Sequence, residues 1–271
     1  MTMESGVSNG PHDSMTWVYL SPHSDDVAFS CGGLLWEQAQ AGQAAQVWTI
    51  CAGDPPPGPI SPFAQALQDR WGVGKSSGER RRQEDLVSCN LLGAVPRHLP
   101  IPDCIYRRDP DRGDFLYPSE ESLFGPLHPA EDGLVEQLAG LLEQTISTGT
   151  AREVNLVCPL TLGGHVDHRL TRAAIERIQS HCPAVRVWYY ADFPYVLDDS
   201  AVLVQLAQER WEAQVFPISA PGLQTWQRSM AAHASQVSTF WSGIPEMQAS
   251  IQAYCEETGG VRLWRKIVAL R

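Results

Sequence analysis

Histidine and aspartate gather in two short segments that lie far apart in this chain. Residues 21–26 read Ser-Pro-His-Ser-Asp-Asp, and residues 165–168 read His-Val-Asp-His. Catalytic zinc takes three nitrogen or oxygen ligands from the protein and leaves one position for water. His23, Asp26 and His168 can supply such a set, because a spacing of three places His23 and Asp26 on one side of a first helical turn. We therefore predict that these three residues bind Zn²⁺, although the same donors also suit Fe²⁺.

Three further polar residues in the two segments are left to act on a substrate. Asp25, beside the ligands, could take a proton from zinc-bound water as general base. His165, as a cation, could stabilise the oxyanion of a tetrahedral intermediate and protonate a leaving amine. Asp167 could orient His165, as carboxylates behind active-site histidines do. This combination predicts a catalytic trio that hydrolyses an amide.

Each of these residues also has an interpretation without catalysis. Asp and Ser are favoured at helix N-caps, so residues 23–26 and Asp167 could simply begin helices. His165 and His168 would then be surface histidines beside a glycine-rich turn. The catalytic interpretation is favoured because both clusters follow a predicted strand, where ligands bind in open α/β sheets.

The elements that must position the two clusters follow from the pattern of apolar residues. Strands are predicted at residues 17–20, 46–51, 98–101, 154–158, 185–190 and 214–218. Helices are predicted at residues 28–40, 64–71, 78–92, 132–145, 167–180, 223–239 and 245–256. Strands and helices alternate up to residue 190, which predicts an α/β fold with a mainly parallel sheet and helices on both faces.

Two predicted loops flank these elements. Residues 53–62 are rich in proline, and residues 102–130 are rich in Pro, Asp and Gly without any periodicity. Long irregular segments of this kind are usually functional. We expect both loops to shape the cleft and to determine the substrate.

The totals restrict the class of protein. The chain has 271 residues and a net charge of −11, a balance that repels nucleic-acid phosphates, so no nucleic-acid partner is expected. No apolar run of 18 residues occurs, so no membrane span is expected. The seven cysteines are scattered and odd in number, which argues against a disulfide framework or a thiolate zinc site and predicts a cytoplasmic protein.

The N-terminus differs in character from the rest of the chain. Residues 1–15 are polar and lack the basic start and apolar stretch of a signal peptide, so we predict a disordered tail. No linker or repeat divides the remainder. We predict a single domain over residues 16–271.

The two segments also resemble the signatures of a known family. Residues 22–26, followed by Cys-Gly-Gly at 31–33, resemble the His-Pro-Asp-Asp-Glu signature of the PIG-L/LmbE-type deacetylases, and residues 165–169 resemble their His-x-Asp-His signature. The resemblance implies a Rossmann-like sheet and a zinc-dependent N-acetylglucosaminyl deacetylase that acts on sugar conjugates. It assigns the metal to His23, Asp26 and His168, the base to Asp25, and the acid or oxyanion role to His165. The chain departs from the pattern at Ser24 and Val27, where the family has proline and glutamate, and these departures leave the substrate open.

The resemblance extends to a predicted substrate pocket. Arg81 resembles a pocket arginine and Asp103 a pocket aspartate that binds sugar hydroxyls, although Arg81 could lie on a solvated helix face and Asp103 in a plain turn. Asp192 and Tyr195 follow a strand and could line the same cleft, but a structural turn is favoured for them.

The sequence thus predicts a zinc-dependent hydrolase that removes an N-acyl group, with acetyl favoured, from an amino sugar or a glycosylated small metabolite. Two alternatives stay open. One is an amidase for another conjugate, such as a thiol-sugar or a long-chain acyl compound. The other is a non-catalytic α/β metal-binding protein. The partner is a small amino-sugar substrate, and a homo-oligomer is compatible with the sequence.

Overall fold

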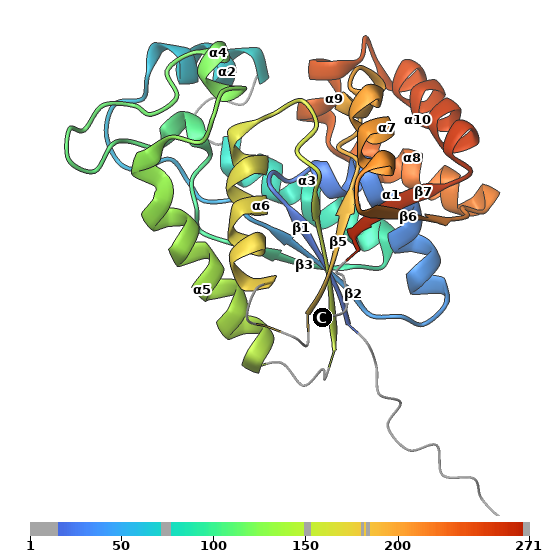
Figure 1. Cartoon of the computed structure of the whole chain (residues 1–271). Coiled ribbons are helices and arrows are strands. Elements are labelled where there is room, and N and C mark those ends of the chain that lie inside the picture. The colour runs from blue at the N-terminus through green and yellow to red at the C-terminus, as the bar shows by residue number, and fades with distance from the viewer. Residues whose placement is uncertain (1–15, 72–76, 149–152, 180–181, 183–184, 268–271) are drawn as a thin grey trace, which may run out of the picture.

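One seven-stranded sheet organises the chain (Figure 1). The structure, a computed structural model, describes residues 16–71, 77–148, 153–179, 182 and 185–267. The predicted tail at residues 1–15 lies outside these ranges. The strands are β1 (Thr16–Ser21), β2 (Ala45–Thr49), β3 (Val95–His98), β4 (Val154–Pro159), β5 (Val185–Tyr190), β6 (Trp211–Phe216) and β7 (Val261–Lys266).

The strand order places a topological switch point at the centre of the sheet. The order is β3-β2-β1-β4-β5-β7-β6, and the first five strands run parallel while β7 is antiparallel to both β5 and β6. The chain moves outward from β1 through β2 to β3 and then returns to add β4 on the other side of β1. In open parallel sheets, the crevice beyond the carboxyl ends of such a central pair is where ligands bind.

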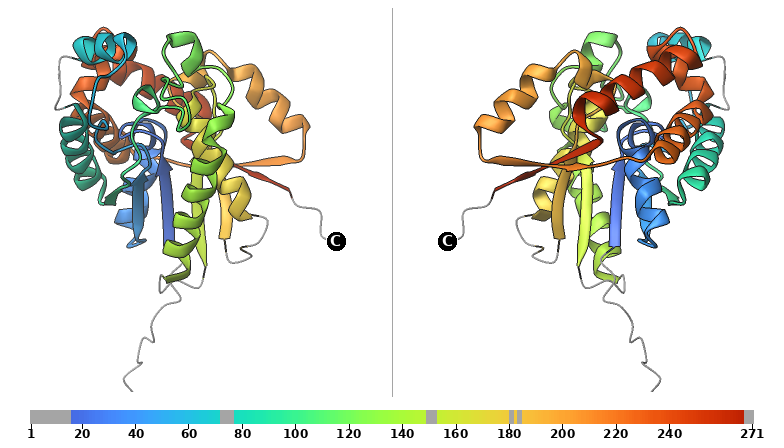
Figure 2. Two further views of the ribbon diagram at one scale, coloured as in Figure 1. Left: turned by 90° about the vertical axis from the view of Figure 1, so that its left-hand side faces the viewer. Right: turned by 90° about the vertical axis from the view of Figure 1, so that its right-hand side faces the viewer.

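Helices cover both faces of the sheet, as the sequence predicts (Figures 1 and 2). Helices α1, α3 and α8 pack together on one face, and α5 and α6 pack together on the other. Every residue of β4 and all but the first of β1 are buried, which explains why both read as continuous apolar runs. The helices are α1 (Asp26–Gln40), α2 (Pro62–Trp71), α3 (Ser77–Leu92), α4 (Glu120–Leu123), α5 (Asp132–Thr148), α6 (Val166–Gln179), α7 (Ser200–Gln208), α8 (Ala220–Ala232), α9 (Ala234–Phe240) and α10 (Ile244–Thr258), with 3-10 turns η2 (Cys104–Tyr106), η3 (Pro129–Glu131) and η4 (Tyr195–Leu197).

Glycines on α1 allow this helix to pack closely against α8. The Trp226 side chain is fully buried, and its indole Nε1 donates to the carbonyl of Ala28 at 2.8 Å. A Cβ atom at position 32 would lie 2.5 Å from Cδ1 of Trp226, well inside normal contact. Gly32 therefore sets the distance between the two helices, and α1 carries the first histidine-aspartate cluster at its N-terminus.

Gly32→Val is accordingly expected to lower the free energy of unfolding by about 1–3 kcal/mol, because the added side chain must displace the indole. Urea denaturation followed by tryptophan fluorescence measures this change. Gly140→Ala on α5 is the matched control, since nothing lies within 4 Å of the added Cβ. This control should gain about 0.4–1 kcal/mol from reduced freedom of the unfolded chain. Equal stabilities of the two variants would contradict the packing argument.

The predicted strand at residues 98–101 is wrong in its position. The observed β3 is Val95–His98, and the chain continues as isolated bridges at Pro100 and Pro102. Proline has no N–H to donate, so a regular ladder cannot continue through these two residues. The apolar Leu99 and Ile101 suggest a strand at this position because both are buried in the core, but they lie beyond the end of β3.

Two predicted elements differ from the observed ones in their boundaries, and one observed helix was not predicted. The predicted helix at residues 223–239 is two helices, α8 and α9, divided at His233, whose φ of −84° and ψ of 53° are not helical. The predicted strand at residues 214–218 is shifted to Trp211–Phe216. Helix α7 was not predicted, because its apolar residues run consecutively and include exposed Val202 and Val204, which gives no amphipathic pattern.

The helices and the cysteines both bear on the class of protein. No helix within the described ranges has the length and hydrophobicity of a membrane span. All seven cysteines are free thiols, and all except Cys182 are buried.

Candidate active site

The two predicted clusters meet at the carboxyl ends of β1 and β4, at the switch point of the sheet. Residues 22–25 join β1 to α1, and residues 160–165 join β4 to α6. The first turn is rigid, because the Ser21 hydroxyl contacts the His23 carbonyl and accepts the Val27 N–H. Parallel pairing of β1 with β4 thus brings together residues that are far apart in sequence.

The three residues predicted as metal ligands lie side by side. Asp26 Oδ2 is 3.3 Å from Nδ1 of His23, and Asp26 Oδ1 is 3.3 Å from Nε2 of His168. Ring nitrogens of His23, His165 and His168 also lie within 4.8 Å of one another. The Asp26 carboxylate therefore sits between two imidazole nitrogens, with a third imidazole beside them.

Both imidazoles that face Asp26 are held from behind by a buried carboxylate. His23 Nε2 lies 3.0 Å from Oδ2 of Asp167, and His168 Nδ1 lies 2.6 Å from Oδ1 of Asp192. Metal-binding histidines commonly carry such a partner on the ring nitrogen away from the metal, because it fixes the tautomer and the ring orientation. This arrangement leaves His23 Nδ1 and His168 Nε2 free to serve as ligands.

The charges around these rings favour a cation at this position. Burial alone would lower the pKa of His168, but Asp26 and Asp192 on its two sides raise that pKa to about 10. Burial likewise opposes charge on His23, yet Asp167, Asp26 and Asp103 raise its pKa well above the usual value. Two nitrogen donors, one carboxylate and surrounding negative charge fit the requirements of a divalent metal ion.

Asp25 is at the N-cap of α1 but does not cap the helix with its side chain. Its carboxylate accepts no hydrogen bond from the first turn of α1. Oδ1 of Asp25 instead lies 3.3 Å from Nη2 of Arg81, and the residue is only 5% exposed. Helix capping therefore does not explain this carboxylate, whose charged partner comes from α3.

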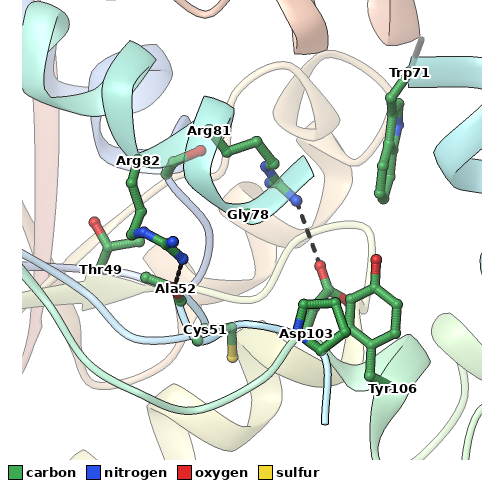
Figure 3. Close-up of a pocket in the computed structure, with 12 residues that line it drawn as sticks. Thr49, Cys51, Ala52, Trp71, Gly78, Arg81, Arg82, Asp103 and Tyr106 are labelled. Carbon is green, nitrogen blue, oxygen red and sulfur yellow. Dashed lines mark hydrogen bonds and ion pairs between the residues drawn. The ribbon is translucent and has the colours of Figure 1, made fainter. Parts of the chain in front are cut away.

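Arg81 contacts both Asp25 and the other predicted substrate residue, Asp103, and Figure 3 shows the contact with Asp103. Its Nη1 is 3.4 Å from Oδ2 of Asp103, and its side chain is 14% exposed. Asp103 also accepts the N–H of Ile105 and so caps η2, which confirms the turn interpretation. Because Asp103 lines the cleft as well, its contact with a substrate stays a prediction. The guanidinium packs over the Trp71 ring at 5.4 Å, so Arg81 lies in the cleft rather than on a solvated face.

His165 caps α6 with its ring. Nδ1 of His165 accepts the backbone N–H of Asp167 at 3.2 Å, so the hydrogen of a neutral ring must reside on Nε2. A cationic His165 is predicted from the sequence, but burial lowers the pKa of His165 well below its usual value and the nearby His23 lowers it further. The structure thus favours a neutral His165 that donates a hydrogen bond.

Asp167 makes different contacts from the one predicted. Its carboxylate contacts His23, the N–H of Cys104 at 3.1 Å and Nη1 of Arg107 at 2.5 Å. Its hydrogen bond to His165 comes from the backbone N–H rather than from the carboxylate. The Asp167 carboxylate thus lies behind His23, a predicted metal ligand. That the same carboxylate orients His165 stays a prediction.

A cleft of about 810 Å³, partly open to solvent, gives access to these residues. All the predicted site residues except Asp167 line this cleft, together with residues of the predicted loop at 102–130, of α2, of α9 and of η4. Aromatic rings make up much of the wall: Phe63, Trp71, Phe124, Tyr195 and Phe240. Flat apolar walls with a few convergent polar groups are typical of small-molecule sites.

Two residues of the site carried little signal in the sequence. Asp192 was favoured as a turn residue, yet it binds His168 and accepts the N–H of Leu162. Its position directly after β5, the strand next to β4, was the signal that pointed to the site. Arg107 gave no signal, because it lies in a segment without periodicity.

Comparison with known proteins gives consistent matches. The sequence profile of the PIG-L family, described as GlcNAc-PI de-N-acetylase, matches residues 18–179. The chain is 32% identical over 199 residues to the 2'-N-acetylparomamine deacetylase of Niallia circulans, which covers 68% of each protein. It is 30% identical over 189 residues to the enzyme of the same name from Streptomyces fradiae, which covers 69% of this chain and 60% of that protein.

A solved structure matches over almost the whole chain. The zinc-inhibited form of teicoplanin deacetylase aligns with a TM-score of 0.79 and 25% identity, covering 94% of this chain and all of that one. This match extends beyond the residues of the family profile into the C-terminal third of the chain.

Proposed function

Because this chain belongs to the PIG-L family of de-N-acetylases, we propose that it is a zinc-dependent hydrolase that removes an acetyl group from the nitrogen of an amino sugar or amino glycoside. The observation that carries the proposal is the arrangement around Asp26. Two histidine nitrogens face this carboxylate, each ring is held from behind by a buried carboxylate, and Asp25 stands beside them without a capping role.

His23, Asp26 and His168 would hold the metal. A zinc ion bound there would polarise the amide carbonyl and lower the pKa of water to about 7. The remaining residues of the site bind the substrate, move the proton and stabilise charge.

Asp25 is the group placed to act as general base. It is a carboxylate on the floor of the cleft, adjacent in sequence to the ligand Asp26. Arg81 contacts its Oδ1, and Oδ2 is the oxygen that would accept a proton from the attacking water. The same carboxyl group can then deliver that proton to the departing amine, so His165 need not act as an acid.

His165 is placed to stabilise the oxyanion. Since Nδ1 accepts the Asp167 N–H, the Nε2–H of the neutral ring is the donor available to the cleft. A preorganised donor of this kind stabilises charge that develops only in the transition state.

His165→Ala is therefore expected to lower kcat by about 10²–10³-fold and to change KM little, as loss of one oxyanion donor does. His128→Ala is the matched control, because His128 caps η3 with its Nδ1 but lies outside this cleft. Steady-state kinetics of amine release compare the two. Full activity of His165→Ala, or an equal loss in His128→Ala, would contradict this role.

The substrate class is proposed from the cleft and from the relatives. Aromatic walls suit the apolar faces of sugar rings, while Asp103 and Arg81 suit their hydroxyl groups. The relatives act, by name, on N-acetylparomamine and on teicoplanin, which are glycosylated small metabolites. These observations favour an N-acetylated glycoside over a thiol-sugar or a long-chain acyl substrate.

A panel of amides tests this choice. Purified protein would be incubated with 2'-N-acetylparomamine, N-acetylglucosamine, a long-chain N-acyl glucosamine and N-acetyl-lysine, and free amine would be measured. We expect the highest kcat/KM for an N-acetyl glycoside and none for N-acetyl-lysine. Preference for the long-chain compound would favour the alternative amidase, and no turnover across N-acetyl glycosides would contradict the proposal.

A further inference from the structure

A buried arginine connects the long loop after β3 to the residues behind the proposed metal site. Arg107 follows η2 and is 6% exposed. Its Nη1 lies 2.5 Å from Oδ1 of Asp167, whose other oxygen contacts Nε2 of His23 at 3.0 Å. A direct chain of contacts therefore runs from Arg107 through Asp167 to a predicted metal ligand.

The other side of the guanidinium is held just as firmly. Nε and Nη2 of Arg107 donate to the two carboxylate oxygens of Glu131, and Nη1 also donates to the carbonyl of Pro102 at 3.2 Å. Glu131 is 2% exposed and accepts the Tyr117 hydroxyl at 2.6 Å. The loop at residues 102–131 thus surrounds a fixed cation that is aimed at Asp167.

The geometry gives Arg107 a specific effect on His23. For His23 to bind a metal through Nδ1, its Nε2–H must be donated, and Asp167 Oδ2 is the acceptor. Asp167 holds this oxygen in place only if its carboxylate plane is fixed, and its further contacts include Arg107 at Oδ1 and the Cys104 N–H at Oδ2. Removal of the guanidinium would let the carboxylate turn away from His23.

We propose that Arg107 is a positioning residue that sets the metal affinity of the site by fixing Asp167 against His23. The inference rests on the proposed metal site. It gives the loop at residues 102–131 a role in metal binding in addition to its place in the cleft wall.

The affinity for Zn²⁺ tests this role of Arg107 directly. It would be measured by titrating metal-free protein with Zn²⁺ in competition with a chromophoric chelator. Arg107→Lys keeps the charge but cannot reach two carboxylates in a planar fork. We expect it to weaken zinc binding by about 10–100-fold, the usual loss when the group behind a metal-binding histidine is disturbed. Glu131→Gln is the matched control, because it disturbs the same buried pair but leaves the Arg107–Asp167 contact, and its zinc affinity should change less than about threefold.

A double-mutant cycle separates positioning from general destabilisation. If Arg107 acts through Asp167, then Arg107→Lys should cause no further loss of zinc affinity in an Asp167→Asn background. Should Arg107→Lys fail to fold, Arg107→Met/Glu131→Met removes the buried pair as a unit, which proteins tolerate better than one unpaired charge. This double variant should show the same 10–100-fold weakening.

The outcomes separate the inference from the function beneath it. Wild-type protein that binds zinc, with variants that bind it equally well, would overturn the role of Arg107 and leave the proposed function standing. Equal weakening by Glu131→Gln, or additive losses in the cycle, would show a merely structural arginine. Wild-type protein that binds no zinc would refute the proposed metal site itself.

Discussion

Asp25→Asn is expected to lower kcat by about 10²–10⁴-fold, the range attributed to a general base. Asparagine keeps the shape of the side chain and an oxygen for Arg81, but it cannot accept a proton from water. Zinc content should stay at the wild-type level, because the three proposed ligands are unchanged. Amine release and metal analysis of the same preparation measure both quantities.

Asp54→Asn provides the comparison for Asp25. Asp54 is also a carboxylate paired with an arginine of α3, Arg82, but its side chain is 71% exposed. Its replacement should leave kcat unchanged. Activity of Asp25→Asn within a few-fold of wild type, with metal retained, would refute the assignment of the base.

The second large effect is expected from loss of a metal ligand. His168→Ala removes a nitrogen donor that faces Asp26, and it also leaves Asp192 buried without its partner. Groups behind a metal-binding histidine usually contribute 10–100-fold to metal affinity, so loss of the ligand itself should cost at least about 10²-fold in zinc affinity. Activity at limiting zinc should fall in parallel.

His98→Gln is the control for this prediction. His98 also contacts a buried aspartate, Asp85 at 2.8 Å, but it lies on the edge strand β3 away from the cleft. This variant should bind zinc as tightly as wild type. Stoichiometric, tightly bound zinc in His168→Ala would contradict the proposed ligand set.

The family and the α/β fold could be predicted from the sequence, and both predictions are confirmed. The physical reason is that parallel strands are buried on both faces, so β1 and β4 read as continuous apolar runs. Each ends at a cluster of histidine and aspartate. The rule that ligands bind at the carboxyl ends of such strands was therefore enough to predict that His23 and His168 lie close together.

The residues behind the site could not be predicted in the same way. Asp192 and Arg107 reach the site through contacts across the sheet and across a long loop, and the periodicity of a sequence does not reveal such contacts. The position of Asp167 shows the same limit, because its spacing from His165 suggested a partner in its own segment. The structure shows that its carboxylate contacts His23, whose position depends on the pairing of β1 with β4.

The protonation of His165 was also outside the reach of the sequence. A histidine near carboxylates is expected to gain a proton, and the sequence places Asp167 two residues away. Burial and the neighbouring His23 oppose a positive charge on His165, and Nδ1 of His165 accepts the backbone N–H of Asp167 in α6. The role that we propose for His165 is therefore that of a neutral hydrogen-bond donor, and the return of the proton is proposed for Asp25.

Removal and return of the metal test most directly whether deacetylation by this protein depends on one bound zinc ion. The purified protein would be dialysed against a chelator, shown by mass spectrometry to contain no metal, and titrated with Zn²⁺ while amine release from an N-acetyl glycoside is followed. We expect no activity in the metal-free protein and full recovery at one zinc ion per chain. Undiminished deacetylation by protein shown to hold no metal would contradict it.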